Sequence, residues 1–282
     1  MRQNEIKVSF EFCPPNTDKN LEKLLQAAGK LNELNPEFFS VTYGAGGTTQ
    51  EGTKNAVCKL REDFSTPVMP HLSCIGSTKA HIRSIIREYV AMDIKRIIAL
   101  RGDLPSGTHD VGEFSYANEL VEFIRKETGD HFIIKVAAYP EFHPEAKTPQ
   151  IDLKNFKRKV DAGADYAITQ YFFNPDAYFH FMDDCRRMGV DIHIIPGIMP
   201  ISNWEKLLQF SQMCGTELPR WLCQRMISFG GDANARRDYG CEVVTKMCEK
   251  LLDSGVPELH FYTLNQSQLT LKVCENLGIK AK

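Results

Sequence analysis

The fold is decided by one stretch of sequence, residues 166–196, which reads YAITQYFFNPDAYFHFMDDCRRMGVDIHIIP. Its two ends, Tyr166–Gln170 and Ile192–Pro196, are short apolar runs typical of buried strands. Between them, Asn174-Pro175 provides a helix N-cap followed by proline at the first helical position. The stretch therefore predicts a strand, a helix and a second strand, the unit from which parallel sheets are built.

The same unit recurs along the whole chain. Eight strand-like runs are separated by segments with apolar residues at helical spacing, and no linker or shift in composition divides the sequence. This alternation predicts a single-domain α/β protein, residues 1–282, folded as a (β/α)8 TIM barrel. A doubly wound parallel sheet is the alternative architecture on pattern alone. The other six runs are Lys7–Phe12, Phe38–Thr42, Val68–Cys74, Arg96–Leu100, Phe132–Tyr139 and Leu259–Leu264.

Composition excludes several classes of protein. The 282 residues carry 34 basic and 36 acidic side chains, a formal net charge of −2, so nucleic acid and anionic membranes are not expected as partners. No apolar stretch is long enough to span a bilayer or to act as a signal peptide, and we expect a cytoplasmic protein. The nine cysteines are widely spaced, so neither a disulfide framework nor a metal site is expected.

A barrel places its active site at the carboxyl ends of its strands, so polar residues there are the candidates for chemistry. In Lys7–Phe12, the two-residue period directs Ser9 and Glu11 into the barrel. A carboxyl flanked by Phe10 and Phe12 is expected to be desolvated, which raises its pKa and suits a general acid. The alternative for Glu11 is a structural carboxylate paired with an arginine.

Other strand ends carry weaker signals. Arg101-Gly102-Asp103 follows the fourth strand, and its glycine lets a ligand approach the backbone closely. The glycines of residues 44–47 are a weak phosphate signal, because Thr49 replaces the last glycine of the dinucleotide-binding motif. Single polar residues at strand ends are more often structural than ligand-binding. Those found here are His71, Tyr139, His143 and Gln170.

Lys135 lies within the fifth strand and is the residue type that forms Schiff bases in aldolases. It precedes Tyr139, at the strand end, by four positions, which places it deep in the barrel and far from a substrate at the mouth. We therefore expect Lys135 to have a packing or ion-pair role.

Six strings of sequence, taken together, are much more specific than any of these signals alone. They are VSFEFCPP (8–15), VTYGA (41–45), ALRGDLP (99–105), AAYPE (137–141), AITQ (167–170) and HFYTLN (260–265). In this order, and over nearly the whole chain, they closely resemble the methylenetetrahydrofolate reductase family, in its short bacterial form.

The resemblance implies a flavoprotein with non-covalent FAD that takes hydride from NADH or NADPH. The product would be 5-methyltetrahydrofolate, made from 5,10-methylenetetrahydrofolate in one-carbon metabolism and methionine biosynthesis. We also expect a homo-oligomer. Two alternatives remain open: electrons delivered through a partner protein, and a catalytically silent barrel that only binds folate or serves as a scaffold.

The resemblance also implies roles for residues on the substrate side. Glu11 matches the general acid that protonates N10 of the folate so that its five-membered ring opens. Asp103 matches a carboxylate beside flavin and pterin, which stabilises the resulting iminium cation. Gln170 matches an amide that contacts the pterin, Phe210 matches an aromatic that stacks with folate or nicotinamide, and Tyr262 is expected to contact the substrate.

One position departs from the family pattern. Gln266 stands where relatives commonly have an arginine that meets the glutamate end of folate, which puts that contact in doubt. The flavin site is implied mainly at the ends of strands two to five. The positions implied for FAD are Thr42, His71, Arg101, Gly102, Asp103, Tyr116, Ala117, Ala137, Tyr139, His143, Asp152 and Lys159.

Overall fold

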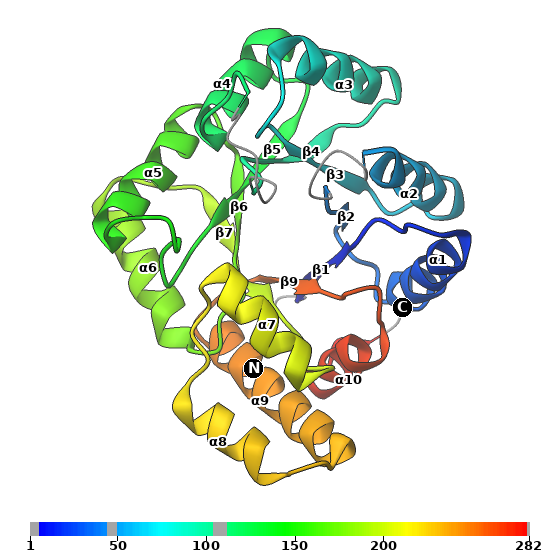
Figure 1. Ribbon diagram of the computed structural model, residues 1–282, viewed down its shortest axis with the longest axis vertical. Coiled ribbons are helices and arrows are strands. Elements are labelled where there is room, and N and C mark those ends of the chain that lie inside the picture. The colour runs from blue at the N-terminus through cyan, green and yellow to red at the C-terminus, as the bar shows by residue number, and fades with distance from the viewer. Residues whose placement is uncertain (1–5, 44–49, 104–111, 281–282) are drawn as a thin grey trace.

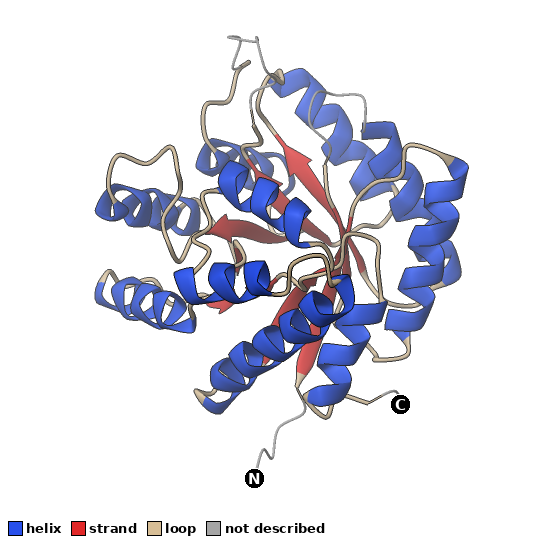
Figure 2. Cartoon of the chain, turned by 60° about the horizontal axis from the view of Figure 1, so that its bottom comes forward, coloured by secondary structure: helices blue, strands red, loops and turns tan. Residues whose placement is uncertain are grey.

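The computed structural model describes residues 6–43, 50–103 and 112–280. Its strands form one parallel sheet that curls around a central axis, and its helices lie outside the sheet (Figure 1). Seen from a second direction, the strands are enclosed by the helices (Figure 2). The glycine-rich segment 44–49 and Leu104-Pro105, at the exit of the fourth strand, lie outside the described residues.

Strands and helices alternate as the sequence predicts up to the seventh strand. The strands are β1 (Lys7–Phe12), β2 (Phe39–Val41), β3 (Val68–Ser73), β4 (Arg96–Leu100), β5 (Ile133–Ala138), β6 (Tyr166–Thr169), β7 (His193–Ile195), β8 (Gly197–Ile198) and β9 (Glu258–Tyr262). The helices are α1 (Asp18–Asn32), α2 (Gln50–Asp63), α3 (Lys79–Ala91), α4 (Ala117–Thr128), α5 (Pro149–Asp161), α6 (Pro175–Arg187), α7 (Trp204–Cys214), α8 (Arg220–Ser228), α9 (Ala233–Asp253) and α10 (Gln268–Asn276). β7 and β8 are adjacent, and three helices, including the unpredicted α8, separate β8 from β9.

Residues 166–196 fold as the sequence predicts, into β6, α6 and β7. Asn174 caps α6 by accepting the backbone N–H of Asp176 at 3.1 Å, and Pro175 is the first helical residue. The helix buries Tyr178, Phe181 and Cys185 against the sheet side of the molecule. No helix in residues 6–43, 50–103 or 112–280 is both long and apolar enough to cross a membrane.

The seventh strand is divided in two, which the sequence did not predict. β7 pairs with β6, whereas β8 pairs with β9, and Pro196 lies between them. Proline has no N–H to donate, but the Pro196 carbonyl accepts the N–H of His260, on β9, at 3.1 Å. The pairing with β9 therefore begins at Pro196, where the pairing with β6 has ended. Because the sheet order runs β7-β6-β5-β4-β3-β2-β1-β9-β8, the division of this one strand closes the barrel.

The core has two layers. The larger layer lies between strands and helices and includes Val8, Phe10 and Phe12 from alternate positions of β1. Ser9 and Glu11 face the barrel interior, so the predicted alternation is confirmed. A small apolar plug fills the middle of the barrel and excludes water beneath the mouth. It consists of Phe38, Met69, Ile98, Ile168 and Ile195.

Candidate active site

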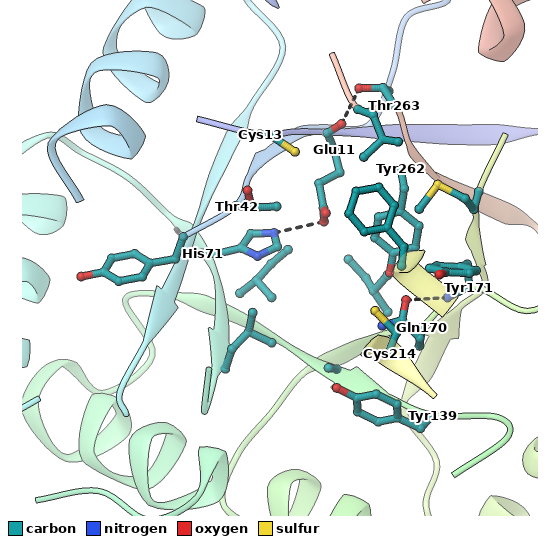
Figure 3. A pocket seen from close by; sticks show the side chains of 18 of the residues that line it. Glu11, Cys13, Thr42, His71, Tyr139, Gln170, Tyr171, Cys214, Tyr262 and Thr263 are labelled. Carbon is teal, nitrogen blue, oxygen red and sulfur yellow. Dashed lines mark hydrogen bonds and ion pairs between the residues drawn. The ribbon is translucent and has the colours of Figure 1, made fainter. Parts of the chain in front are cut away.

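A cavity of about 340 Å³ opens above the apolar plug, at the carboxyl ends of the strands (Figure 3). A cavity of this size at this end of a barrel is the expected place for a ligand. Several predicted site residues from different strands meet in its lining. They are Glu11, Thr42, His71, Ala137, Tyr139, Gln170, Phe210 and Tyr262.

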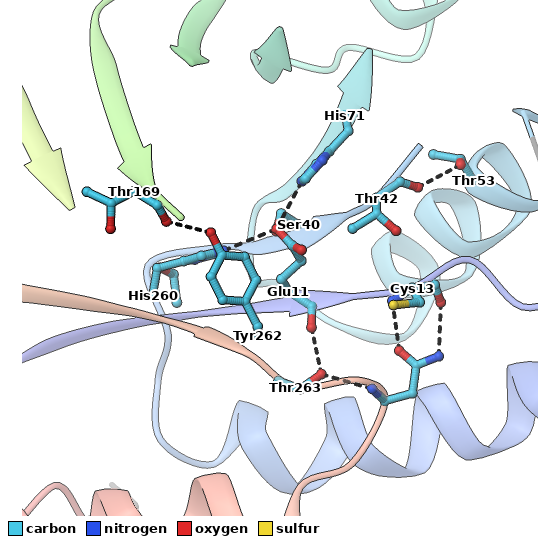
Figure 4. A network of polar contacts seen from close by, with 12 residues as sticks. Glu11, Cys13, Ser40, Thr42, Thr53, His71, Thr169, His260, Tyr262 and Thr263 are labelled. Carbon is cyan, nitrogen blue, oxygen red and sulfur yellow. Dashed lines mark hydrogen bonds and ion pairs between the residues drawn. The ribbon is translucent and has the colours of Figure 1, made fainter. Parts of the chain in front are cut away.

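Glu11 is the centre of a polar network inside this cavity (Figure 4). Its side chain is 13% exposed, and its Oε2 lies 3.2 Å from Nε2 of His71 and 3.4 Å from Nε2 of His260. The Ser40 hydroxyl donates to the same oxygen at 3.4 Å. The Glu11 backbone carbonyl accepts the Thr263 hydroxyl at 2.6 Å, which fixes the end of β1 against the end of β9.

The expected rise in the pKa of Glu11 is wrong. Burial raises it, but the charges and hydrogen bonds of His71 and His260 outweigh burial, and the pKa falls to about 2. The arginine partner that a structural role would need is replaced by these two histidines, which come from β3 and β9. Burial lowers the pKa of His260 in turn, so at neutral pH Glu11 is ionised beside a neutral His260.

His260 was missed by sequence reasoning as a site residue. Its Nδ1 lies 2.9 Å from the Ser9 hydroxyl, and its ring stacks on Phe38 with centroids 5.5 Å apart. The side chain is fully buried and does not line the cavity, but it contacts Glu11, which does. A signal was present, because His260 and Tyr262 alternate along β9 as inward-facing positions do.

The opposite wall holds Gln170 and Tyr262. The Gln170 side-chain oxygen accepts the Tyr171 N–H at 3.0 Å, which orients the amide at the cavity. The Tyr262 hydroxyl donates to the Thr169 carbonyl at 2.7 Å, across the line where the barrel closes. Phe210, on α7, lines the same cavity from the helix side.

A basic group lies behind the end of β5. Lys159, on α5, donates to the Ala137 carbonyl at 2.6 Å, and burial, opposed by the charge of Asp152, lowers the pKa of Lys159 to about 8. Asp152 also accepts the His143 N–H at 3.0 Å, and the edge of the His143 ring meets Tyr139 with centroids 4.6 Å apart. Lys159, Asp152 and His143 are therefore held beside the cavity by β5, but they do not line it.

The exit of β4 carries the remaining charged candidates. Arg101 pairs with Glu145, its Nη2 lying 2.8 Å from Oε1. Gly102 has φ +83°, and a Cβ there would lie 1.9 Å from the Ser73 hydroxyl, so the position requires glycine. Asp103 is exposed, and its charge adds to burial in raising the pKa of Tyr139, a residue of the cavity lining, so Asp103 lies near that wall of the cavity.

Three further predicted positions, like those at the exit of β4 and behind the end of β5, lie outside the cavity lining. Tyr116 is 58% exposed at the start of α4, and Ala117 follows it as the first helical residue. Gln266 is exposed beyond β9, where its N–H donates to the Thr263 carbonyl at 2.9 Å. Any ligand that reached these positions would extend outward from the mouth.

Comparisons with known proteins agree with this geometry. The family model of methylenetetrahydrofolate reductase matches residues 1–278. The chain is 42% identical over 278 residues to the 5,10-methylenetetrahydrofolate reductase of Escherichia coli (strain K12), covering 99% of this chain and 93% of that protein. It is 36% identical over 290 residues to methylenetetrahydrofolate reductase (NADH) 1 of Arabidopsis thaliana, covering 98% of this chain and 49% of that protein.

A solved structure shares the fold at low sequence identity. It is a Clostridium thermocellum protein described as binding two copies of 5-methyl-5,6,7,8-tetrahydrofolic acid, with a TM-score of 0.69 and 16% identity. The match covers 98% of this chain and 96% of that one. The cavity at the barrel mouth, the six strings of sequence and the full-length matches thus lead to one assignment: the chain belongs to the methylenetetrahydrofolate reductase family.

Proposed function

We propose that this chain reduces 5,10-methylenetetrahydrofolate to 5-methyltetrahydrofolate, with FAD as cofactor and reduced nicotinamide as the hydride source. The observation that carries the proposal is Glu11, a buried carboxylate at the cavity with imidazoles on two sides. Opening the folate ring requires a proton at N10, and a largely buried carboxyl that lines the cavity is placed to deliver it. The names of the relatives support the choice of substrate.

The residues implied for the flavin suit a ligand with a pyrophosphate. Arg101 and Lys159 are cations near the ends of β4 and β5, and Thr42 adds a hydroxyl at the cavity. Cations with several N–H donors are the side chains that bind phosphate oxygens. We propose that Arg101, His143 and Lys159 hold the pyrophosphate and ribose, while Thr42, His71 and Ala137 border the flavin ring. When bound, FAD would supply a carrier of hydride between nicotinamide and folate.

Substrate binding is assigned to the other side of the cavity. Gln170 would donate and accept hydrogen bonds with the pterin, and Phe210 would stack on the folate or the nicotinamide. Tyr262, held by its bond to Thr169, would present its ring as a fixed wall. Asp103 would place a negative charge near the cation that forms when the folate ring opens.

Glu11 must gain a proton before it can donate one, because it is ionised in the free protein. His260 lies beside Glu11, their nearest atoms 3.4 Å apart, and behind it stands the fully buried Ser9 hydroxyl, which cannot draw a proton from solvent. Glu11 itself lines the cavity. We therefore propose that Glu11 takes its proton from solvent in the cavity between turnovers, beside a neutral His260.

Anaerobic spectroscopy of the purified protein tests the proposal. The protein should be yellow, release FAD on denaturation, lose its flavin absorbance when NADH or NADPH is added, and regain it when 5,10-methylenetetrahydrofolate follows. A colourless protein from flavin-replete cells, or one that releases FMN, would contradict the cofactor assignment. Bleaching that needs an added protein would favour electron delivery by a partner. The homo-oligomer and the cytoplasmic location expected from the sequence stay predictions.

A further inference from the structure

Lys135 has no role in the mechanism above, although it is buried inside the barrel. It faces inward from β5, is 6% exposed, and lies below the cavity rather than in its lining. Its Nζ lies 3.9 Å from the centroid of the Phe38 ring and 5.1 Å from that of Tyr166. No hydrogen bond or ion pair of the Lys135 side chain is found among the described residues; its surroundings are the faces of these two rings and the charge of Glu258, which favours the ammonium.

The Phe38 ring connects this ammonium group to the site. The same ring stacks on His260 with an interplanar angle of 17°, and His260 lies 3.4 Å from Glu11. Lys135, Phe38 and His260 therefore form a column from the floor of the barrel toward its mouth. The aromatic ring excludes water from the column, so the charge of Lys135 is weakly screened along it.

The column has consequences for the charge on His260. A positive imidazole would be repelled by the ammonium below it, and both cations would compete for the π-electrons of one ring. His71 also disfavours the cationic imidazole, whereas Glu11 favours it. The titratable or polar groups that face His260 are Ser9 and Glu11 from β1, His71 from β3, Lys135 from β5, and Glu258 and Tyr262 from β9 itself.

We propose that Lys135 is a positioning residue for the reaction: through the shared Phe38 ring, its ammonium keeps His260 neutral, so that the Glu11 carboxylate is less strongly stabilised and takes up a proton more readily. With a cationic His260 beside it, Glu11 would be held as a carboxylate in an ion pair and would be a poor acid. With a neutral His260, the stabilisation of the carboxylate is smaller and a proton stays on Glu11 more readily. This inference rests on the proposed function, because it assigns Glu11 to proton transfer.

The first test measures His260 directly. Lys135→Met and Lys135→Gln remove the charge at similar volume, and Lys135→Arg retains it. In the purified protein with its flavin, labelled with ¹³C at the histidine rings, the His260 signal is identified by its loss in His260→Gln. A unit charge roughly 9 Å away through a partly screened interior shifts a pKa by about one pH unit. The His260 titration should move upward by that amount in both neutral variants and stay at the wild-type value in Lys135→Arg.

The second test measures the two half-reactions as a function of pH. In Lys135→Met, the acidic limb of the folate half-reaction should move upward with the His260 titration, while flavin reduction by nicotinamide keeps its pH profile. Lys135→Met and Lys135→Gln should show the same shift of the acidic limb. A melting curve identifies a variant that fails to fold. The Lys135 side chain makes no hydrogen bond in the described structure, so neither substitution breaks one. Loss of the fold is therefore not expected in both variants.

Each outcome decides one point. An unchanged His260 titration in both neutral variants overturns the inference, as does an equal shift in Lys135→Arg. A shifted titration with an unshifted folate half-reaction shows that His260 does not control Glu11, and this also overturns it. If wild-type protein does not reduce the folate at all, the proposed function fails, whereas the His260 titration still decides whether Lys135 controls that imidazole.

Discussion

The mouth and the floor of the barrel contain the same pair of residue types in different surroundings. At the mouth, Glu11 faces His71 at 3.2 Å, and at the floor Glu258 faces His193 at 3.5 Å. The pKa of each carboxyl is lowered: burial acts against ionisation, and histidines together with other neighbours outweigh it. Only Glu11 lines the cavity of about 340 Å³, whereas Glu258 is 7% exposed and lies at the entry of β9.

This difference shows that a perturbed carboxyl does not by itself identify a site. Buried ion pairs shift pKa values in structural positions as well as in catalytic ones. What separates the two carboxyls is their access to a cavity: Glu11 lines the one at the carboxyl ends of the strands, whereas Glu258 lines neither that cavity nor the one of about 270 Å³ that His193 borders at the floor. We therefore assign chemistry to Glu11 and structure to Glu258, and the predictions below test that division.

The largest expected effect comes from removing the two carboxyls in turn. Glu11→Gln should slow the folate half-reaction by roughly 100-fold to 10,000-fold and leave flavin reduction nearly unchanged, since only ring opening needs a proton. Glu258→Gln should keep both half-reactions close to wild type. Stopped-flow measurement of each half-reaction checks this, and a comparable loss in both variants would remove the distinction between mouth and floor.

The next effect concerns the line where the barrel closes below the mouth. At Gly197, a Cβ would lie 2.2 Å from the Thr169 carbonyl and 2.6 Å from the Tyr262 ring. β6 and β9 carry Thr169 and Tyr262, and neither strand can move away without separating the two sides of the barrel that meet here. Gly197→Ala should therefore lower the free energy of unfolding by about 3 kcal/mol. Gly231→Ala is the matched control, because nothing lies within 4 Å of its Cβ position. Equal denaturation midpoints for the two variants would argue against a tight closure.

A smaller effect is expected at the rim of the mouth, where burial raises the pKa of Glu141 to about 7 and the N–H of Glu217 opposes that rise. The folded chain binds the proton more tightly than the unfolded chain, whose pKa is near 4.5, so this carboxyl lowers stability as pH rises from 4.5 to 7. Glu141→Gln should keep the 2.8 Å contact with Glu217 and be more stable than wild type at pH 8 by about 1 kcal/mol, after allowance for solvent screening.

Urea denaturation at several pH values checks the Glu141 prediction. The gain in Glu141→Gln should vanish below pH 4.5, where both folded and unfolded wild-type chains are protonated. The exposed Glu22→Gln serves as control and should show no such dependence. A gain that is independent of pH would mean that packing, not charge, is responsible.

The smallest effect is expected outside the mouth, at Gln266. Gln266→Arg introduces a planar cation that can bind a carboxylate with two hydrogen bonds, but the position is exposed. The gain should be roughly 1 kcal/mol, about five-fold in KM for the folate, with little change in kcat. Steady-state kinetics with mono- and polyglutamyl substrates measures it, and an unchanged KM for both would place the folate tail elsewhere.

Apart from the divided seventh strand and α8, sequence alone determined the order of strands and helices, the barrel as the favoured architecture, and the inward direction of Glu11. These features depend on local regularities, the periods of strands and helices and the caps between them, which neighbouring residues specify. The six strings of sequence also determined the family. They lie at the ends of different strands, and these strand ends meet at the mouth of the barrel, where the site is. The predicted site residues that meet in the cavity come from β1, β2, β3, β5, β6, β9 and α7 or the residues just beyond their ends.

Only the tertiary structure decided the electrostatics of the site and the closure of the barrel. The low pKa of Glu11 depends on His71 and His260, the latter 249 positions away in the chain, and a sequence pattern does not rank such distant pairs. The division of the seventh strand at Pro196 depends on two partners, β6 and β9, that lie on opposite sides of it. Lys135 likewise gains its aromatic neighbours from Phe38, just before β2, and from Tyr166 on β6. Charge interactions and strand pairing act through space, so they are fixed only when the chain has folded.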